Sequence, residues 1–194
     1  YWAKLDNNKE YNKVREETIS YYIELTVTHA TEWDFAQVLY QMCKDEFICV
    51  SIKNNCWYEF IGHRWFEIDS GNTLRLLISK TMWHIYVDKM AEETRKLQSM
   101  EQSDKIYEDT KEKAGKLAEI AYLLKKTTWK TNIMKEAKEL FYDKDFITKL
   151  DDNPYLLCFN NCVIDFKNNI HRKGLPDDYI SKCTNIDYVP YDID

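Results

Sequence analysis

The sequence predicts an α+β fold, a helical bundle with two small antiparallel β meanders. Apolar residues recur at three- and four-residue spacing over long stretches, which indicates helices, and two other stretches are rich in β-branched and aromatic residues, which indicates strands. The helical and strand-like segments are grouped and do not alternate as they do in an α/β fold. With 194 residues, of which 44% are hydrophobic, the chain can bury one substantial core or two small adjoining cores.

The N-terminal part is predicted to be helical. Apolar residues at roughly helical intervals between 9 and 27 predict one or two helices. Thr31, followed three positions later by Asp34, is typical of a helix N-terminus, because both side chains can satisfy free backbone amides. An apolar stripe from Phe35 to Cys43 continues this second helix.

The first β meander is predicted between residues 47 and 68. Three short strands, at about 47–52, 56–60 and 64–68, are separated by polar breaks. Asn55 and Gly62 lie in these breaks, and both tolerate the positive φ that tight turns require.

The central part of the chain is predicted to be a series of helices. Residues 69–72 form a cap, after which apolar residues from Leu74 to Met90 repeat at helical spacing. Residues 91–103 are polar and lack this periodicity, so we expect a helix end or an exposed connection there; one continuous helix is the alternative. Further helices are expected over 114–124 and 129–141, with a short helical turn at 146–150 that ends before Pro154.

The second β meander is predicted near the C-terminus. Its strands are expected at 155–159, 162–166 and 170–172. The polar turns between them contain Asn160-Asn161 and Lys167-Asn168-Asn169.

Composition excludes several classes of protein. The 27 Lys and Arg against 33 Asp and Glu give a net charge of -6, which argues against a surface that binds phosphate backbones mainly by bulk electrostatics. The six cysteines occur without a signal peptide or a dense disulfide framework, so we expect reduced thiols and folding in the cytosol, not secretion. No stretch approaches the roughly 20 apolar residues of a membrane span, so no membrane partner is expected.

Motifs for catalysis, cofactors or metals are not found in the sequence. It has no phosphate-binding P-loop, dinucleotide glycine pattern, nucleophile elbow or metalloprotease histidine pair, so we predict no catalytic, cofactor-binding or metal residues. Cys158 and Cys162 with His171 have donor atoms that can bind zinc, but a turn between the cysteines favours ordinary core thiols. Aspartates are plentiful and could hold a divalent ion in principle, yet loop solvation and helix capping explain them better. They are Asp143, Asp145, Asp151, Asp152, Asp177 and Asp178.

One basic stretch is a candidate nucleic-acid site. Lysines surround a tryptophan that could stack a base, and the exposed face of the first meander adds an arginine. The predicted contact residues are Lys125, Lys126, Trp129, Lys130, Lys135 and Arg64. The alternative is that Trp129 anchors the core beside solvated lysines, and the acidic neighbours Glu136 and Glu139 favour it.

An ordered succession of short motifs resembles a known viral family. The motifs are Asp34-Phe35-Ala36, Asp45-Glu46-Phe47, Trp57-Tyr58-Glu59-Phe60, Arg64-Trp65, the run Leu150 to Asn161, Val163-Ile164-Asp165-Phe166, Arg172-Lys173-Gly174 and Asp177-Asp178-Tyr179-Ile180-Ser181. Together they resemble the helicase-preceding domain of poxvirus-type primase-helicases of superfamily III, found in nucleocytoplasmic large DNA viruses and giant viruses. The family usually has Asn-Gly where this chain has Asn161-Cys162, which puts a tight primed turn there in doubt.

The resemblance implies a place in a larger machine. It implies that residues 1–30 are a helical connection from a primase, 31–188 a collar-like domain and 189–194 the start of a connection to a helicase motor. The implied parent is an ATP-dependent DNA helicase and primase that forms a hexameric ring and uses ATP and Mg in its motor. Its location would be the host cytoplasm or a viral factory.

Three functions follow from the sequence. The first is a non-catalytic scaffold and coupling domain whose partners are the neighbouring primase and helicase domains, the other ring subunits and single-stranded DNA. The second is a single-stranded DNA-binding module in its own right. The third is a metal-dependent primase or nuclease remnant.

Overall fold

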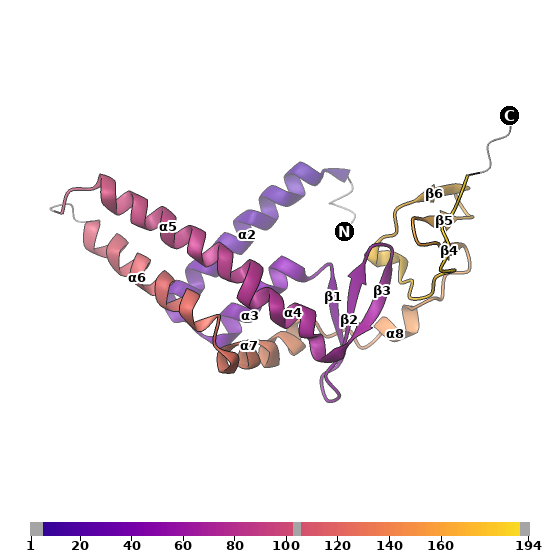
Figure 1. Cartoon of the computed structure of the whole chain (residues 1–194), viewed down its shortest axis with the longest axis horizontal. Helices are drawn as coiled ribbons and strands as arrows, with labels where there is room; N and C mark the ends of the chain where they lie inside the picture. Colours follow the sequence, from indigo (N-terminus) through magenta and orange to yellow (C-terminus); the bar gives the residue numbers. More distant parts are fainter. Residues whose placement is uncertain (1–5, 103–105, 191–194) are drawn as a thin grey trace. The chain divides into compact units, whose positions relative to one another are not determined.

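The computed structural model describes residues 6–102 and 106–190, which form two compact units (Figure 1). The β unit comprises Cys43–Gly71 and Phe141–Asp194 together with the segment up to Asn8, and the helical unit comprises Lys9–Met42 and Asn72–Leu140. The predicted α+β class is confirmed. Residues 191–194, which belong to the predicted connection to a motor, lie outside the described residues.

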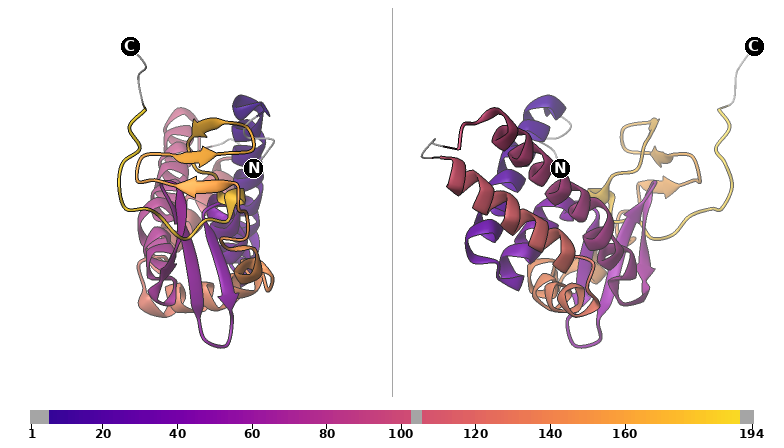
Figure 2. Two further views of the ribbon diagram at one scale, coloured as in Figure 1. Left: turned by 90° about the vertical axis from the view of Figure 1, so that its right-hand side faces the viewer. Right: turned by 60° about the vertical axis from the view of Figure 1, so that its left-hand side comes forward.

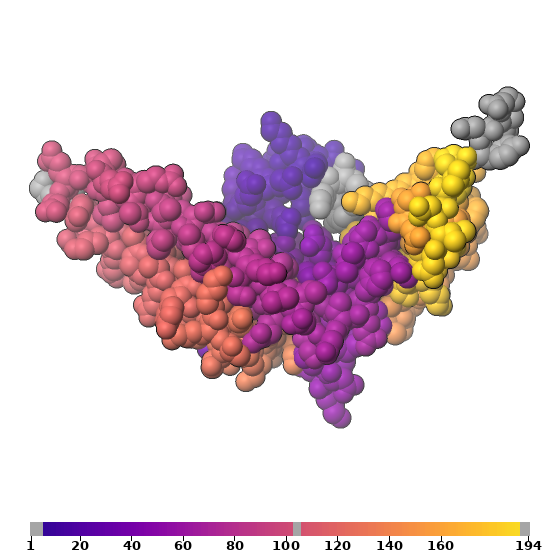
Figure 3. Space-filling model, in the orientation of Figure 1, coloured from indigo at the N-terminus to yellow at the C-terminus, as the bar shows by residue number. Residues whose placement is uncertain are grey.

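The helical unit consists of two N-terminal helices and a longer helical series. Its elements are α2 (Asn8–His29), α3 (Glu32–Cys43), α4 (Asn72–Leu77), the π-helical turn η2 (Ile78–Met82), α5 (Trp83–Ser99), α6 (Tyr107–Leu123) and α7 (Thr127–Leu140). α5 and α6 run side by side in all views (Figures 1 and 2), and their side chains pack closely on the face drawn in Figure 3. Of the two predicted possibilities for residues 9–27, the single helix is observed.

The cap at Thr31 is confirmed. Its Oγ1 accepts the backbone N–H of Asp34 at 3.2 Å and donates to the Asp34 carboxylate at 2.6 Å. This pairing satisfies a backbone donor that the first turn of α3 would otherwise leave free.

The helix end predicted within residues 91–103 is observed, because α5 ends at Ser99 after continuing through most of this polar segment. This polar segment is held by ion pairs and not by an apolar stripe. Glu93 is only 9% exposed and lies 3.2 Å from Lys96 and 3.4 Å from Lys113, which also pairs with Glu24 of α2 at 2.8 Å. α2, α5 and α6 are therefore linked through charged side chains that periodicity of apolar residues does not detect.

The π turn η2 explains how α4 and α5 keep one buried face. Leu74, Ile78, Met82 and Tyr86 are all fully buried and recur at exact intervals of four. In a regular α-helix with 3.6 residues per turn, three such steps would rotate the row by about 120°. The wider i to i+5 turn corrects this rotation, so the four side chains face the same core. Tyr86 completes this core with a 2.8 Å hydrogen bond to the buried Thr26 of α2.

The first sheet of the β unit matches the predicted meander. β1 (Phe47–Ser51), β2 (Cys56–Ile61) and β3 (Arg64–Ile68) are antiparallel in the order β1-β2-β3. Asn55 has φ 53° and Gly62 has φ 65°, so both predicted turn residues adopt the left-handed conformation. The hairpin loop between β1 and β2 is visible in Figures 1 and 2.

The second sheet is smaller. β4 (Leu156–Cys158), β5 (Val163–Asp165) and β6 (Ile170–Arg172) are antiparallel in the order β4-β5-β6. Neither Asn160 nor Asn161 has a positive φ, so the turn before Cys162 is not a primed turn. A short 3₁₀ turn, η3 (Pro176–Asp178), leads into the C-terminal strap, which we define as residues 179–186.

An aromatic cluster forms the centre of the β unit. Phe146, in α8 (Phe146–Lys149), is fully buried, and its ring contacts Tyr58, Trp65 and Tyr179 at centroid distances of 5.2, 5.1 and 5.9 Å. The indole N–H of Trp65 donates to the carbonyl of Pro176 at 2.8 Å. Phe146 therefore packs against both the first sheet and the strap, which are far apart in the sequence.

Candidate nucleic-acid interface

A group of cations gathers on the helical unit around the connection between α6 and α7. We call Arg75, Lys125, Lys126 and Lys130 the cationic surface. Arg75 comes from α4, Lys125 and Lys126 from the connection, and Lys130 from the first turn of α7. None of the ion pairs among the described residues includes any of these four side chains.

Lys125 is held in place by the π turn. In a regular helix the N–H of Trp83 would donate to the carbonyl of Ser79, but here it donates to the carbonyls of Ile78 and Lys80. The Ser79 carbonyl instead accepts the ammonium of Lys125 at 2.5 Å. The same ammonium lies 3.7 Å from the ring centroid of Trp83, a cation–π contact. The π turn thus leaves the Ser79 carbonyl available to hold the ammonium of Lys125 at the surface.

Arg75 and Lys130 bring two further positive charges close to Lys125. One terminal nitrogen of Arg75, Nη2, lies 3.4 Å from the carbonyl of Thr127 and 3.5 Å from the hydroxyl of Thr131. Burial lowers the pKa of Lys130, and the positive charges of Arg75 and Lys125 lower it further. Burial is the larger cause, and the contribution from Arg75 and Lys125 shows that the three cations lie close together.

Lys126 contacts an exposed aromatic ring. Its ammonium lies 4.4 Å from the ring centroid of Tyr122, which is 64% exposed. A charged group beside an exposed ring is a common arrangement in sites that contact phosphates and stack bases.

Of the six residues predicted for nucleic-acid binding, the structure brings three together. Trp129 contacts the fully buried Phe35 edge to face at 5.3 Å, so its ring anchors the core, as the alternative stated. Lys135 is exposed in the middle of α7, five positions after Lys130, which turns it by about 140° around the helix. Arg64 belongs to β3 in the β unit, where it donates to the carbonyl of Ser181 at 3.3 Å and lies over the ring of Phe66.

Three residues of this region escaped prediction. Arg75, Trp83 and Tyr122 are distant in sequence from the lysines that they join or support. The exact four-residue spacing of the buried row from Leu74 to Tyr86 was the available signal, because it indicates a π turn, and such turns are frequent at functional sites.

Three aspartates of the β unit, Asp151, Asp165 and Asp178, are engaged in folding it. The carboxylate of Asp178 accepts hydrogen bonds from both terminal nitrogens of Arg172 at 2.7 Å and from the N–H of Leu175 at 2.7 Å. Asp165 accepts the N–H groups of Lys167 and Asn168 at 3.1 Å. These carboxylates fix a turn and the approach to the strap.

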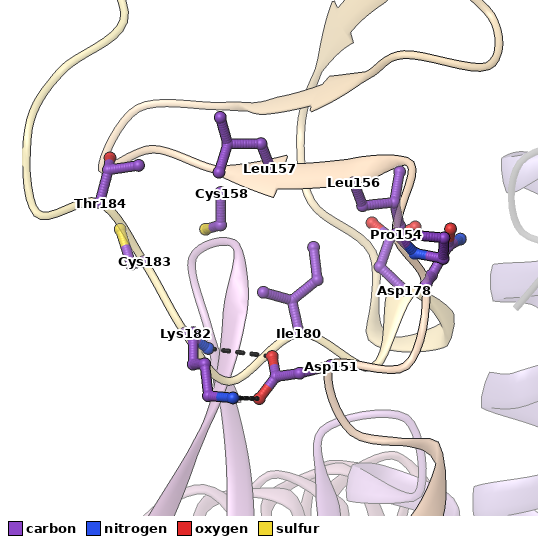
Figure 4. Close-up of a pocket in the computed structure, with 11 residues that line it drawn as sticks. Asp151, Pro154, Leu156, Leu157, Cys158, Asp178, Ile180, Lys182, Cys183 and Thr184 are labelled. Carbon is purple, nitrogen blue, oxygen red and sulfur yellow. Dashed lines mark hydrogen bonds and ion pairs between the residues drawn. The ribbon is translucent and has the colours of Figure 1, made fainter.

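Asp151 fixes the strap itself. It adopts the left-handed conformation with φ 57°, and its carboxylate accepts the N–H of Ser181 at 2.8 Å, the hydroxyl of Ser181 at 2.5 Å and the N–H of Lys182 at 3.1 Å. It lines a cavity of about 400 Å³ between β4 and the strap, together with Cys158, Ile180 and Cys183 (Figure 4). Burial raises the pKa of Asp151, but the hydrogen bonds from Ser181 and Lys182 outweigh burial and lower it overall.

We expect Asp151 to make the β unit sensitive to acid. A carboxylate with a lowered pKa stabilises the folded state above its unfolded pKa of about 3.9, and this contribution is lost as the pH falls through the folded value. Asp151→Asn keeps the shape and tolerates the same backbone, so it should cost about 1–2 kcal/mol at pH 7 and flatten the stability loss below about pH 4. Urea denaturation at several pH values measures both effects. The adjacent, exposed Asp152→Asn is the control, and an equal response of the two variants would refute the expectation.

Within the described ranges, no three His, Cys, Asp or Glu side chains come together as a metal site. Cys158 and Cys162 are both buried, and burial raises the pKa of each thiol. For Cys158 the pKa reaches about 12, to which the neighbouring Cys183 contributes. Protonated thiols of this kind are poor metal ligands and nucleophiles.

No described helix combines the length and the apolar character that crossing a membrane requires.

The fold and the cationic surface define a mixed helical and β domain with a candidate polyanion-binding face. Residues 36–193 match a protein family described as D5 N terminal like, and the chain belongs to this family. The family resemblance seen in the sequence is confirmed.

The chain is also similar to proteins of several large DNA viruses. It is 36% identical over its whole length to a provisionally named helicase of Acanthamoeba polyphaga mimivirus, and 24% identical over 80% of its length to one of Frog virus 3. It covers 20% and 19% of these proteins, so it spans about one fifth of the length of each. A segment of 56 residues, 29% of the chain and 6% of the relative, is 48% identical to a provisionally named helicase of Invertebrate iridescent virus 3.

Proposed function

We propose that this chain is the non-catalytic scaffold and coupling domain of a viral DNA replication helicase. It connects a primase domain to an ATP-driven superfamily III motor, contacts the other subunits of a ring, and acts in the host cytoplasm or a viral factory. ATP and Mg are used by the motor and not by this domain. Its relatives carry helicase names, and they extend well beyond the region that it matches.

One observation carries this proposal: three carboxylates of the β unit, two of them among the aspartates that could hold a divalent ion, are engaged in holding this unit together. Asp151, Asp165 and Asp178 each accept three hydrogen bonds, which come from their own turn, from the strap or, for Asp178, also from Arg172 of β6. Carboxylates that hold a catalytic metal need free oxygen atoms directed at a common point. The engagement of these aspartates supports a structural role over a primase or nuclease role.

The proposal is tested with Arg172→Ala, which breaks the paired hydrogen bonds to Asp178. In the longer protein, below its melting temperature, we expect unwinding per ATP hydrolysed to fall severalfold while ATP hydrolysis itself is largely kept. Lys173→Ala, an exposed neighbour, is the control. Magnesium- or manganese-dependent primer synthesis or DNA cleavage by the 194-residue chain alone would refute the non-catalytic role.

A further inference from the structure

Several lysines of the helical unit are paired with glutamates. Lys96, Lys111, Lys113 and Lys116 each lie within 3.5 Å of a glutamate carboxylate. The four side chains of the cationic surface have no ion-pair partner among the described residues, and neither have Lys80, Lys89, Lys135 and Lys138. The cationic surface differs from these lysines because Arg75 and Lys125 lie close to Lys130. On a chain of net charge -6, an uncompensated group of four cations is a local exception that favours an anionic ligand.

The cations are also positioned before a ligand arrives. The Ser79 carbonyl and the Trp83 ring hold the ammonium of Lys125, and Thr127 and Thr131 hold one nitrogen of Arg75. The remaining N–H groups of the Arg75 guanidinium have no hydrogen-bond partner in the part of the chain that the structure describes. Fixed donors lose less conformational entropy on binding, and a guanidinium fork suits a phosphate group.

An aromatic ring adjoins this group of charges. Tyr122 is 64% exposed and lies beside Lys126. Duplex DNA hides its base faces, whereas a single strand can place a base on such a ring. The ring therefore favours a single strand over a duplex as the anion.

We propose that the cationic surface binds the phosphate backbone of single-stranded DNA, with Tyr122 as the stacking platform for one base. Arg75, Lys125 and Lys130 contact phosphates, and Lys126 contacts the strand beside the stacked base. Binding of the phosphates relieves the repulsion among the cations. The inference rests on the proposed function, because it names the DNA strand that the scaffold would guide.

The test is binding of a fluorescein-labelled oligothymidine to the 194-residue chain, followed by fluorescence anisotropy over a salt series. We expect the double variant Lys125→Glu with Lys130→Glu to weaken binding at least about tenfold and to reduce the logarithmic salt slope by about 1.4, since each phosphate contact on a single strand contributes about 0.7. The control is Lys111→Glu with Lys116→Glu, which makes the same change of charge on α6 and disrupts only exposed ion pairs.

The stacking contact has its own test. Tyr122→Ala should weaken binding about fivefold or more, and Tyr122→Phe should restore it, because the ring and not the hydroxyl is needed. Tyr21→Ala removes a ring of 61% exposure elsewhere on the helical unit and should have no effect. An unlabelled duplex of equal length should compete less well than the single strand.

The inference would be overturned by no binding to the unaltered chain, by equal effects of the two double variants, or by stronger competition from the duplex. Displacement of the strand by inorganic phosphate at low millimolar concentration would also overturn it, because it would identify a simple anion site. None of these outcomes touches the coupling role, which the Arg172→Ala experiment examines in the longer protein.

Discussion

Replacing Phe146 with alanine is expected to destabilise the β unit by about 3–5 kcal/mol. The ring is fully buried and contacts aromatic rings from the first sheet and from the strap. Its removal would lose the transfer free energy of the side chain and leave a cavity that three large rigid neighbours cannot easily fill. Urea denaturation followed by tryptophan fluorescence measures the loss, because Trp57 and Trp65 lie in the same unit.

The matched control is Phe166→Ala. Phe166 also belongs to the β unit, but its side chain is 57% exposed. We expect its replacement to cost less than about 1 kcal/mol. Similar losses for both variants would show that Phe146 is not central to the packing of this unit.

A second large effect is expected for Gly174→Ala. A Cβ atom at this position would lie 2.5 Å from the carbonyl oxygen and 2.6 Å from the Cα of His63, both of them backbone atoms that cannot rotate away. The N–H of Gly174 also donates to Nδ1 of His63 at 2.8 Å. Relief of the clash would move the segments around Gly174 and His63 apart and break this hydrogen bond. We therefore expect a loss of about 3 kcal/mol or more in the free energy of unfolding.

Gly115→Ala serves as the control for this substitution. Gly115 lies inside α6, and an added Cβ there would meet no heavy atom within 4 Å. Because alanine is the better helix former, the change should stabilise the protein by about 0.5–1 kcal/mol. Thermal denaturation of the two variants should therefore give shifts of opposite sign, and a tolerated Gly174→Ala would contradict the close approach.

The sequence was sufficient for most of the fold because its signals are local. The cap at Thr31 and the turns at Asn55 and Gly62 are set by side chains within a few residues, and the structure has all three. The extension of α5 to Ser99 could not be seen in this way. Glu93 is stabilised by Lys113, twenty positions later, and no periodicity of apolar residues records such a pair.

The candidate site was predictable only in part for the same reason. Lys125, Lys126 and Lys130 are neighbours in the sequence, so their grouping was visible. Arg75 joins them through the contact between α4 and α7, about fifty positions away, and no local pattern indicates it. Trp129 was ambiguous because an aromatic residue on an amphipathic helix serves the core and a ligand equally well until its partner, Phe35, is known.

The wide turn at Ile78–Met82 acts as the insertion of a single residue into an otherwise continuous rod. If this segment closed into an ordinary helix without losing a residue, everything from Trp83 onward would rotate by about 100° relative to α4. Tyr86 would then turn away from Thr26, and Trp83 would turn away from Lys125. The buried row of the helical unit and the position of Lys125 on its surface thus depend on the same wide turn.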